Sequence, residues 1–452
     1  MKLLRKNSLD SSKTLLLSML YILAFSIVNT TDAHAESLVD VYALAKQNDT
    51  ELQIAESRYQ AEALARPIAR ANLLPQASIS ANSTDVRTES SGATFGIAGT
   101  TVNFNDNGFT LNFNQALYHH DFYVQLRQSK NTVARARVDL DTTYQNLLVR
   151  TADTYFNVLA ELDNVSFRQS EKEAIGRQLE QAKRRFEVGL IAITDVKEAQ
   201  ASYDLAVADE IEAQIALETS KDALEVIIAQ RLDSFHPLSD RMQLVAPDPS
   251  SAEDWVAKAL EQNLALLSSE YNTRIAQQEI KVQQSQHYPT LDLVASRREA
   301  STGGLSGSRD DRDTRIGVQL SIPLLAGGRV HYRTKEARHN ASVADGEYEQ
   351  IKRQTVQNTR NAYLNVISGI SRVNALARAL ESTEAAAEAA EAGFQVGTRT
   401  SVDVLLALQE TFRAKRDYSR ARYDYLLNTL NLKQAVGTLN IDDLVQIDSW
   451  LN

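Results

Sequence analysis

The sequence repeats itself at an offset of 208 residues. Residues 152–158 (ADTYFNV) return as residues 360–366 (RNAYLNV), and residues 186–196 return as 394–404 with the same Phe, Val, Gly, Asp and Val at matching places. A length of 452 residues alone would suggest about three domains. A duplicated unit explains the matches better than unrelated domains do, so the chain is expected to fold as two copies of one plan.

Both copies predict the same order of elements. Long stretches without Pro, rich in Ala, Leu, Gln, Glu and Arg, predict helices, and period-two alternation between them predicts strands. The repeats are expected over 36–236 and 252–452, with a Pro-containing linker over 237–251. The helices are expected at 38–71, 119–186 and 196–230, and again at 252–286, 328–394 and 402–436.

The helix expected at 119–186 constrains the architecture most. Its 68 residues would span roughly 100 Å, far more than a helix of a globular domain. Apolar residues recur every seven positions in two stripes, Leu126-Val133-Leu140-Leu147 and Leu148-Tyr155-Leu162. Two stripes need neighbours on two sides, as in a curved wall of coiled coils. We expect the two shorter helices of each repeat to stack end to end along the long one; a solvated coiled-coil rod is the alternative.

Residues 1–35 have the features of a secretory signal peptide. Four basic residues precede or border an apolar run, Thr14–Val28, and Ala33-His34-Ala35 supplies a cleavage site. The run has 15 residues, fewer than the ~20 that a spanning helix needs. Cleavage is therefore expected rather than a membrane anchor. The mature chain is then either soluble outside the cytoplasm or enters a membrane as strands.

Charge and Cys content exclude several classes of protein. Without residues 1–35 the net charge is −12, which argues against a general nucleic-acid binder because phosphates need a basic surface. The chain has no Cys, which excludes a disulfide scaffold, a Cys-ligated zinc site, a Cys nucleophile and a lipid anchor on Cys.

Four stretches between the helices alternate apolar and polar residues, as outer-membrane strands do. They lie near 76–82, 109–114, 291–293 and 316–322. Polar, Ser- and Gly-rich loops are expected at 84–108 and 299–314, at the tips of two hairpins. Aromatic residues favour the membrane–water boundary, and a cluster of them, with two His, stands where strand gives way to helix: Tyr118, His119, His120, Phe122 and Tyr123. A half-buried soluble sheet, with ordinary packing at the junction, is the alternative.

Four strands cannot span lipid alone, because an open sheet leaves two edges of unpaired backbone groups in hydrocarbon. The chain must therefore assemble if it enters a membrane. Two copies would give a barrel of eight strands, and side chains would fill its interior. Three copies would give twelve strands, enough for an open lumen.

The mature chain resembles the TolC family of outer-membrane efflux channels along essentially its whole length. The residues that carry the resemblance are 185–190 (RFEVGL) with 193–196 (ITDV), and 396–400 (VGTRT) with 402–405 (VDVL). The resemblance implies a mixed α/β fold, a trimer with a twelve-stranded transmembrane β-barrel in the outer membrane of a Gram-negative bacterium. A long α-helical coiled-coil tunnel would cross the periplasm and close at its far end. It implies an exit duct for drugs, toxic compounds or secreted proteins, as in tripartite efflux or type I secretion.

The tip residues have a structural explanation of their own. Gly189 and Gly397 allow the backbone angles of a reversal. Thr194 and Ser401 are expected to cap the returning helices. Asp195 and Asp403 fall in the first turns of those helices, where a carboxylate is favoured, and capping alone could explain them.

The resemblance adds gating roles to these positions. It assigns Asp195, beside Thr194, and Arg399 to a charge-assisted link between neighbouring coiled coils. Phe394 stands where the family's best-known member has a hydrogen-bonding Tyr, so the closed state is expected to be held less firmly. Asp403 matches one of two Asp rings at the entrance. Leu406 replaces the second, so the entrance is expected to be more apolar and less sensitive to blocking cations.

Partners also follow from the resemblance. A periplasmic adaptor is expected to dock at two segments, where a small Gly admits a partner helix hairpin: Val188, Gly189 and Leu190, and Val396, Gly397 and Thr398. The adaptor would connect to an inner-membrane transporter.

No catalytic, metal or cofactor site is expected, because the seven His are scattered and no phosphate-binding motif occurs. The protein is therefore not expected to be an enzyme. A soluble periplasmic coiled-coil adaptor or scaffold is the alternative function, and the alternating stretches with their polar loops argue against it.

Overall fold

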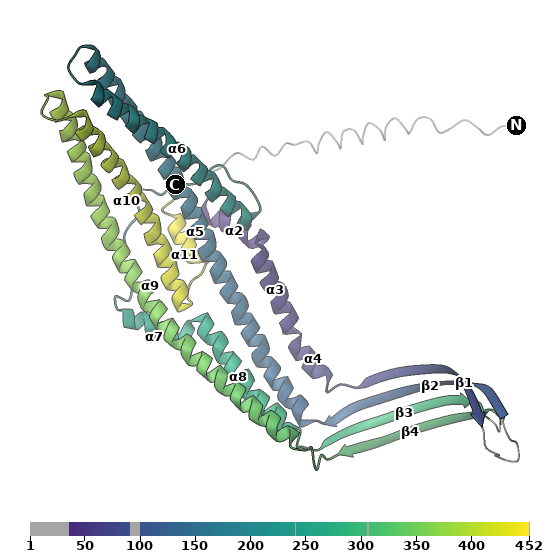
Figure 1. The fold of residues 1–452 in the computed structure, drawn as a ribbon. Coiled ribbons are helices and arrows are strands. Elements are labelled where there is room, and N and C mark those ends of the chain that lie inside the picture. The colour runs from purple at the N-terminus through teal and green to yellow at the C-terminus, as the bar shows by residue number, and fades with distance from the viewer. Residues whose placement is uncertain (1–35, 91–99, 240, 305–306, 452) are drawn as a thin grey trace, which may run out of the picture.

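A computed structural model describes residues 36–90, 100–239, 241–304 and 307–451; the expected signal peptide lies outside them. The described chain is elongated, with helices at one end and a single four-stranded sheet at the other (Figure 1). This confirms the expected combination of long helices with a short set of strands.

The helices follow the predicted order with two differences. Their bounds are α2 Leu38–Asn48, α3 Thr50–Ala63, α4 Ala65–Ala71, α5 His120–Glu187, α6 Ile193–Ile228, α7 Ala252–Gln262, α8 Leu264–Ser285, α9 Arg329–Gln395, α10 Ser401–Val436 and α11 Ile441–Asp448. The two long helices, α5 with 68 residues and α9 with 67, are confirmed. The helices expected at 38–71 and 252–286 are each interrupted, and α11 was not expected.

Capping side chains inside the expected helices mark two of these interruptions, at Asp49 and Asn263. The Asp49 carboxylate accepts a hydrogen bond from the Leu52 amide (2.7 Å) and starts α3. The Asn263 side chain accepts one from the Leu266 amide (2.9 Å) and starts α8. A cap of this kind satisfies an amide that would otherwise lack a partner at a helix start. The same kind of cap thus starts a new helix after α2 in the first half of the chain and after α7 in the second.

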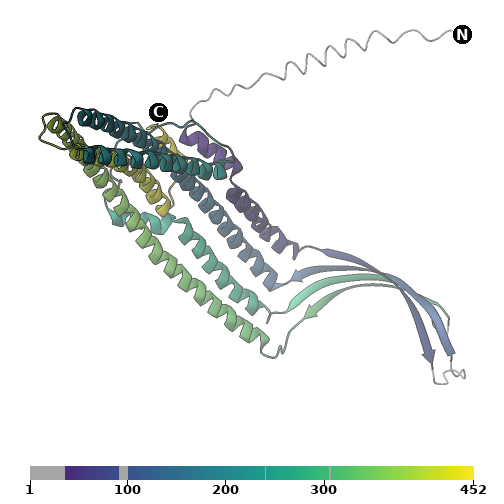
Figure 2. The same ribbon diagram turned by 45° about the horizontal axis from the view of Figure 1, so that its top comes forward.

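The shorter helices stack end to end along the long ones, as expected. Along α5, α6 covers the half that is remote from the sheet, and α3 and α4 cover the half next to it (Figures 1 and 2). Along α9, α10 and α8 take the corresponding places. We call the α5–α6 pair the first coil and the α9–α10 pair the second coil. Their free ends lie side by side at the end of the molecule farthest from the sheet.

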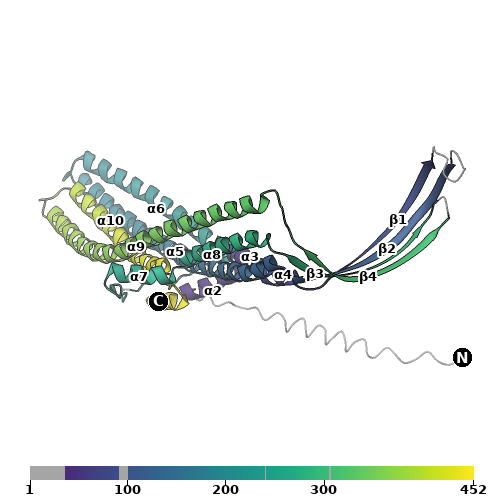
Figure 3. The same ribbon diagram turned by 90° about the horizontal axis from the view of Figure 1, so that it is seen from below.

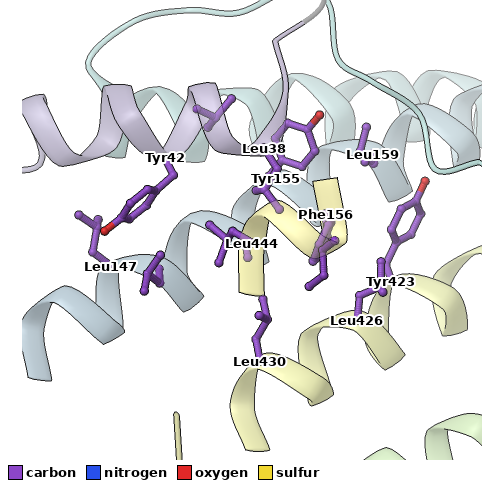
Figure 4. Packing of buried hydrophobic residues seen from close by; sticks show 14 of the residues in the cluster. Leu38, Tyr42, Leu147, Tyr155, Phe156, Leu159, Tyr423, Leu426, Leu430 and Leu444 are labelled. Carbon is purple, nitrogen blue, oxygen red and sulfur yellow. The ribbon is translucent and has the colours of Figure 1, made fainter. Parts of the chain in front are cut away.

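The main apolar core lies midway, where α2, α5, α10 and α11 meet (Figure 4). Tyr155 and Leu444 are 0 % exposed there. The Tyr155 hydroxyl donates to the Glu36 carbonyl (3.0 Å) and lies 3.3 Å from the His236 amide, which donates to it. Burial raises the pKa of Tyr155. This core ties the start and end of the described chain to the middle of the long helix.

The sheet is an antiparallel meander in the order β1-β2-β3-β4. Its strands are β1 Gln76–Ser90, β2 Thr100–Tyr118, β3 Thr290–Thr302 and β4 Arg309–Ser321. The loops expected at 84–108 and 299–314 are therefore wrong at 84–90, 100–108, 299–302 and 309–314, which are strand; 91–99 and 305–306 lie outside the described residues. The strand pairing continues from Ile79↔Leu111 up to Ser90↔Thr100. Polar residues on both faces removed the alternation on which the strand prediction depended, but backbone pairing does not require it.

One face of the sheet carries an apolar row that none of the described residues covers. Exposed side chains on it include Ile79, Leu111, Ile316, Val318 and Leu320 (45–77 % exposed). The apolar residues of β3 lie nearer the helices than those of β2, because Leu111 of β2 pairs with Arg297, four residues after Leu293 of β3. Strands that are tilted relative to a flat boundary show such a shift between neighbours. The sheet curves along its length (Figure 3), and the outer edges of β1 and β4 pair with no other described strand.

Among the described residues, no helix combines enough length and apolarity to cross a membrane.

Candidate functional site

The free ends of the two coils are closed by turns of the same design. The first tip segment, residues 188–192, joins α5 to α6, and the second, residues 396–400, joins α9 to α10. Gly189 and Gly397 have φ values of 74° and 81°. The Leu190 amide donates to the Arg185 carbonyl and the Thr398 amide to the Gly393 carbonyl, both at 2.8 Å. These bonds satisfy the last helical carbonyls.

The helix starts beyond the turns differ from the expected caps. Thr194 lies inside α6, whose N-cap is Ala192 without a side-chain bond. Ser401 is the first residue of α10, buried, with no partner for its hydroxyl among the described residues. Thr400 is the cap instead. The capping side chain must stand one residue before the first helical residue, a boundary that residue type alone does not fix.

Thr400 and Asp403 form a reciprocal capping box. The Thr400 hydroxyl accepts from the Asp403 amide (3.1 Å), and the Asp403 carboxylate accepts from the Thr400 amide (2.8 Å) and hydroxyl (2.9 Å). The Thr400 amide, then its hydroxyl and the nearby Arg399, lower the pKa of Asp403. The expected first-turn position of Asp403 is confirmed, and so is that of Asp195.

The tip segments present exposed apolar side chains and bare backbone. Val188, Leu190 and Val396 are 70–76 % exposed. A Cβ added at Gly189 or Gly397 would meet nothing within 4 Å. Both turns are thus open surfaces that another molecule can approach closely.

The residues expected to lock the tips are not joined within one chain. Asp195 and Arg399 form no ion pair in the described part of the chain; Asp195 is approached by the Thr194 hydroxyl at 3.5 Å. Arg399 packs over Gly393, its Cγ 2.8 Å from the place of a Cβ there. Both charges remain available to another chain.

Phe394 is held by a residue that sequence reasoning missed. Its ring is 3 % exposed and packs with Ala390 and Val404 of the second coil. The guanidinium of Arg185, from the first coil, lies over the ring at 4.1 Å from its centroid. Arg185 Nη1 also donates to the Phe394 carbonyl at 3.3 Å. The only available signal was that Arg185 directly precedes the repeated Phe-x-Val-Gly motif.

Leu405 and Leu406 point to different surroundings. Leu405 is 3 % exposed and packs into the seam of the first coil, against an apolar set of Ile175, Leu179, Ala182, Ala199 and Ala206. Leu406 is 56 % exposed. The second coil thus inserts one leucine into the first and leaves the next one exposed.

A buried charged cluster joins the coils farther from the tips. The Glu171 carboxylate, 6 % exposed, accepts from Arg168 (3.1 Å) of its own helix and from Arg416 (2.8 Å) of the second coil. Arg168 also contacts Asp209 of α6 at 2.7 Å. The three helices α5, α6 and α10 are therefore fixed to one another at this level.

The junction between sheet and helices carries the expected aromatic cluster. The ring of His119 stacks on Phe122 (4.5 Å between centroids) and approaches Asp292 at 3.2 Å. Tyr118 and Tyr123 are each 42 % exposed. Both ordinary packing and an outward aromatic face are present here.

Nothing in the described residues groups three or more His, Cys, Asp or Glu side chains as a metal site requires. The arrangement offers two open tips, charged groups around them and an uncovered apolar sheet face, and it can act by assembly and movement.

Comparison with known proteins agrees with this arrangement. The family model described as outer membrane efflux protein matches residues 41–230 and 255–438. Outer membrane protein TolC of Vibrio cholerae is 35 % identical over 422 residues, covering 92 % of this chain and 94 % of that protein. The alkaline protease secretion protein AprF of Pseudomonas aeruginosa is 28 % identical over 429 residues, covering 93 % and 88 %.

A solved structure of CusC, described in connection with transmembrane channel formation, matches with a TM-score of 0.76 at 16 % identity. The match covers 91 % of this chain and 96 % of that one. At this identity the structural match shows the fold alone, and it covers both the helices and the sheet.

Proposed function

Because the chain belongs to the outer membrane efflux protein family, and therefore serves as an exit duct in the outer membrane, we propose that three copies close into one twelve-stranded barrel. Channels of this family are trimers that work with other pump components, and they are channels rather than enzymes. Each chain would contribute two hairpins, one from each proposed repeat (36–236 and 252–452).

The observation that carries this proposal is the open sheet with an uncovered apolar face. Its outer strands, β1 and β4, each have one edge without a partner strand among the described residues, and such edges cannot persist in hydrocarbon. Pairing β4 of one copy with β1 of the next removes both edges. Twelve strands leave an open lumen where eight would be filled. The long helices then continue the wall on the periplasmic side.

The cargo would pass from an inner-membrane transporter through a periplasmic adaptor into this duct. Small toxic compounds, drugs and secreted proteins are the proposed cargo classes; among the relatives, AprF is named for protease secretion. The alternative of a soluble periplasmic adaptor is disfavoured, because strands of 13–19 residues with an exposed apolar face would aggregate in water.

The duct would be closed at its inner end by links between chains. Asp195 of one copy and Arg399 of a neighbour would form one such link, which is supported by the absence of an ion pair for either within the described part of one chain. Asp403 would form a ring of three carboxylates at the entrance and give cation preference, with Leu406 as an apolar neighbour.

The adaptor would dock at the exposed tip segments, over Val188, Gly189 and Leu190 and over Val396, Gly397 and Thr398. Their support is the open space above both glycines. Replacement of Gly189 or Gly397 by Arg should weaken transport while the trimer still forms, because a long side chain would occupy that space.

Two experiments test the proposal. A peptide tag inserted after Gly304 should be accessible on intact cells, since the sheet end would face outside, whereas the adaptor alternative leaves it inaccessible. For the lock, the chain without Cys can carry Asp195→Cys together with Arg399→Cys. Oxidation should give covalent trimers on a non-reducing gel; only monomers would contradict a link between chains. Asp195→Cys alone is the control.

A further inference from the structure

We infer that Arg185 is a further gating residue, which clasps the tip of the second coil against the first within each chain. This inference rests on the proposed closure of the inner end and names a contact that would regulate it. The clasp is intramolecular, so it is separate from the link proposed between Asp195 and a neighbouring Arg399.

One side chain makes two contacts across the gap between the coils. The Arg185 guanidinium lies 4.1 Å from the centroid of the Phe394 ring, well inside the ~6 Å reach of a cation–π interaction. Its Nη1 donates to the Phe394 carbonyl at 3.3 Å. The planar group thus covers the ring and holds the backbone of the same residue.

The ring is not free to turn away. Phe394 packs with Ala390 and Val404 in the seam of the second coil and is 3 % exposed. Arg185 therefore contacts a residue that can move only together with the second coil. A force that separates the coils must break the cation–π contact and the hydrogen bond together.

The helix ends add a favourable field. Arg185 stands in the last turn of α5, and the carbonyl that it reaches belongs to the last turn of α9. The carbonyl ends of helices carry partial negative charge. The cation thus lies at the negative ends of two helices, which stabilises it in the clasped position.

The clasp lies nearest the tips among the contacts between the coils that are described above. Next comes Leu405 in the first coil's seam, and then the buried pair of Glu171 and Arg416. Along α10, Leu405 and Arg416 are separated by roughly 16 Å at 1.5 Å per residue. Tip separation would break the contacts in this order, with the charged cluster as the fixed point.

The test measures separation of the coils without any transport. Ala182 is 0 % exposed in the seam that receives Leu405, so Ala182→Cys places a single thiol where only separation exposes it. The alkylation rate of this thiol by a water-soluble maleimide is compared in the purified, detergent-solubilised trimer. Circular dichroism and native gels verify that each variant is folded and trimeric.

Arg185→Ala should raise the alkylation rate about fivefold to thirtyfold, as the loss of a partly desolvated cation–π contact implies. Phe394→Leu, which keeps an apolar side chain but removes the π face, should raise it as well. The double variant should raise it no further than the stronger single one. Arg185→Lys, which keeps the charge but not the planar stack, should fall between. The matched control is Arg184→Ala, an exposed neighbour.

Equal rates for Arg185→Ala and Arg184→Ala would overturn the clasp. Bilayer conductance of the same proteins separates this failure from that of the proposed function. If the wild type conducts and Arg185→Ala leaves the alkylation rate of the thiol unchanged, the clasp is rejected and the duct is retained. If the wild type does not conduct but Arg185→Ala raises the alkylation rate of the thiol, the duct is rejected and the contact between Arg185 and Phe394 is retained.

Discussion

The buried Glu171 cluster gives the sharpest prediction of stability. Glu171→Gln keeps the shape of the side chain but removes the negative charge that lies between Arg168 and Arg416. Arg416 then loses this carboxylate and Arg168 keeps only its contact with Asp209, in a setting where Glu171 is only 6 % exposed. The variant should therefore loosen the attachment of α10 to α5.

The magnitude follows from burial. Removal of one partner from a fully buried ion pair costs about 3–5 kcal/mol. The two arginines are 18 % and 25 % exposed and Gln retains an accepting oxygen, so about 2–3 kcal/mol is expected here. Residues 36–452 have an unfolding entropy of roughly 0.9 kcal/mol/K. The midpoint of thermal unfolding should therefore fall by about 2–4 °C.

The assay is thermal loss of the far-ultraviolet circular dichroism of the solubilised trimer. Glu173→Gln, two residues away and exposed, is the matched control and should change stability by less than about 0.5 kcal/mol. If Glu171→Gln and Glu173→Gln have the same midpoint, the cluster does not fix the two coils and the reasoning is refuted.

Two further predictions concern the backbone and the entrance. Gly437→Ala should lower the unfolding midpoint clearly, because φ is 91° and the new Cβ would lie 2.3 Å from the Gln262 carbonyl oxygen; Gly346→Ala, in the open interior of α9, should raise it slightly, and the reverse order would contradict the glycine argument. Because the pKa of Asp403 is lowered below its ordinary 3.8, its carboxylate is favoured in the folded tip, an effect that is present above pH 3.8 and is lost as the pH falls through the lower folded value. Cation preference in a bilayer should therefore persist below pH 3.8, and Thr400→Val should move its loss to higher pH; an unchanged pH profile in that variant would count against the capping box.

Periodicity revealed the long elements because they repeat one environment over many turns. The seven-residue stripes of α5 predicted neighbours on two sides: α3, α4 and α6 follow one another along it, and α8 and α10 contact it as well. The helix breaks at Asp49 and Asn263 were not predicted, because a single capping side chain decides each of them. The full length of the strands was not predicted, because their outer ends carry polar residues on both faces and so lack the apolar–polar alternation.

Contacts between the coils could not be predicted from the sequence. Arg185 and Phe394 are 209 residues apart, and Arg416 and Glu171 are 245 apart. The apolar pattern tells which face of a helix is covered, but the choice of a particular cation depends on the rotation and stagger of two separate coils. The family resemblance therefore suggested Asp195 and Arg399, whereas the residue types at the tips gave no reason to select Arg185.

Single-channel current across a planar bilayer tests the central claim, that three copies form a duct closed at its inner end. The purified wild-type trimer should give a small, cation-preferring conductance, and Arg399→Ala, with one link of the closed end removed, should give a larger one. No conductance from either protein, in a preparation shown to be folded and trimeric, would contradict the duct and favour a periplasmic adaptor or scaffold.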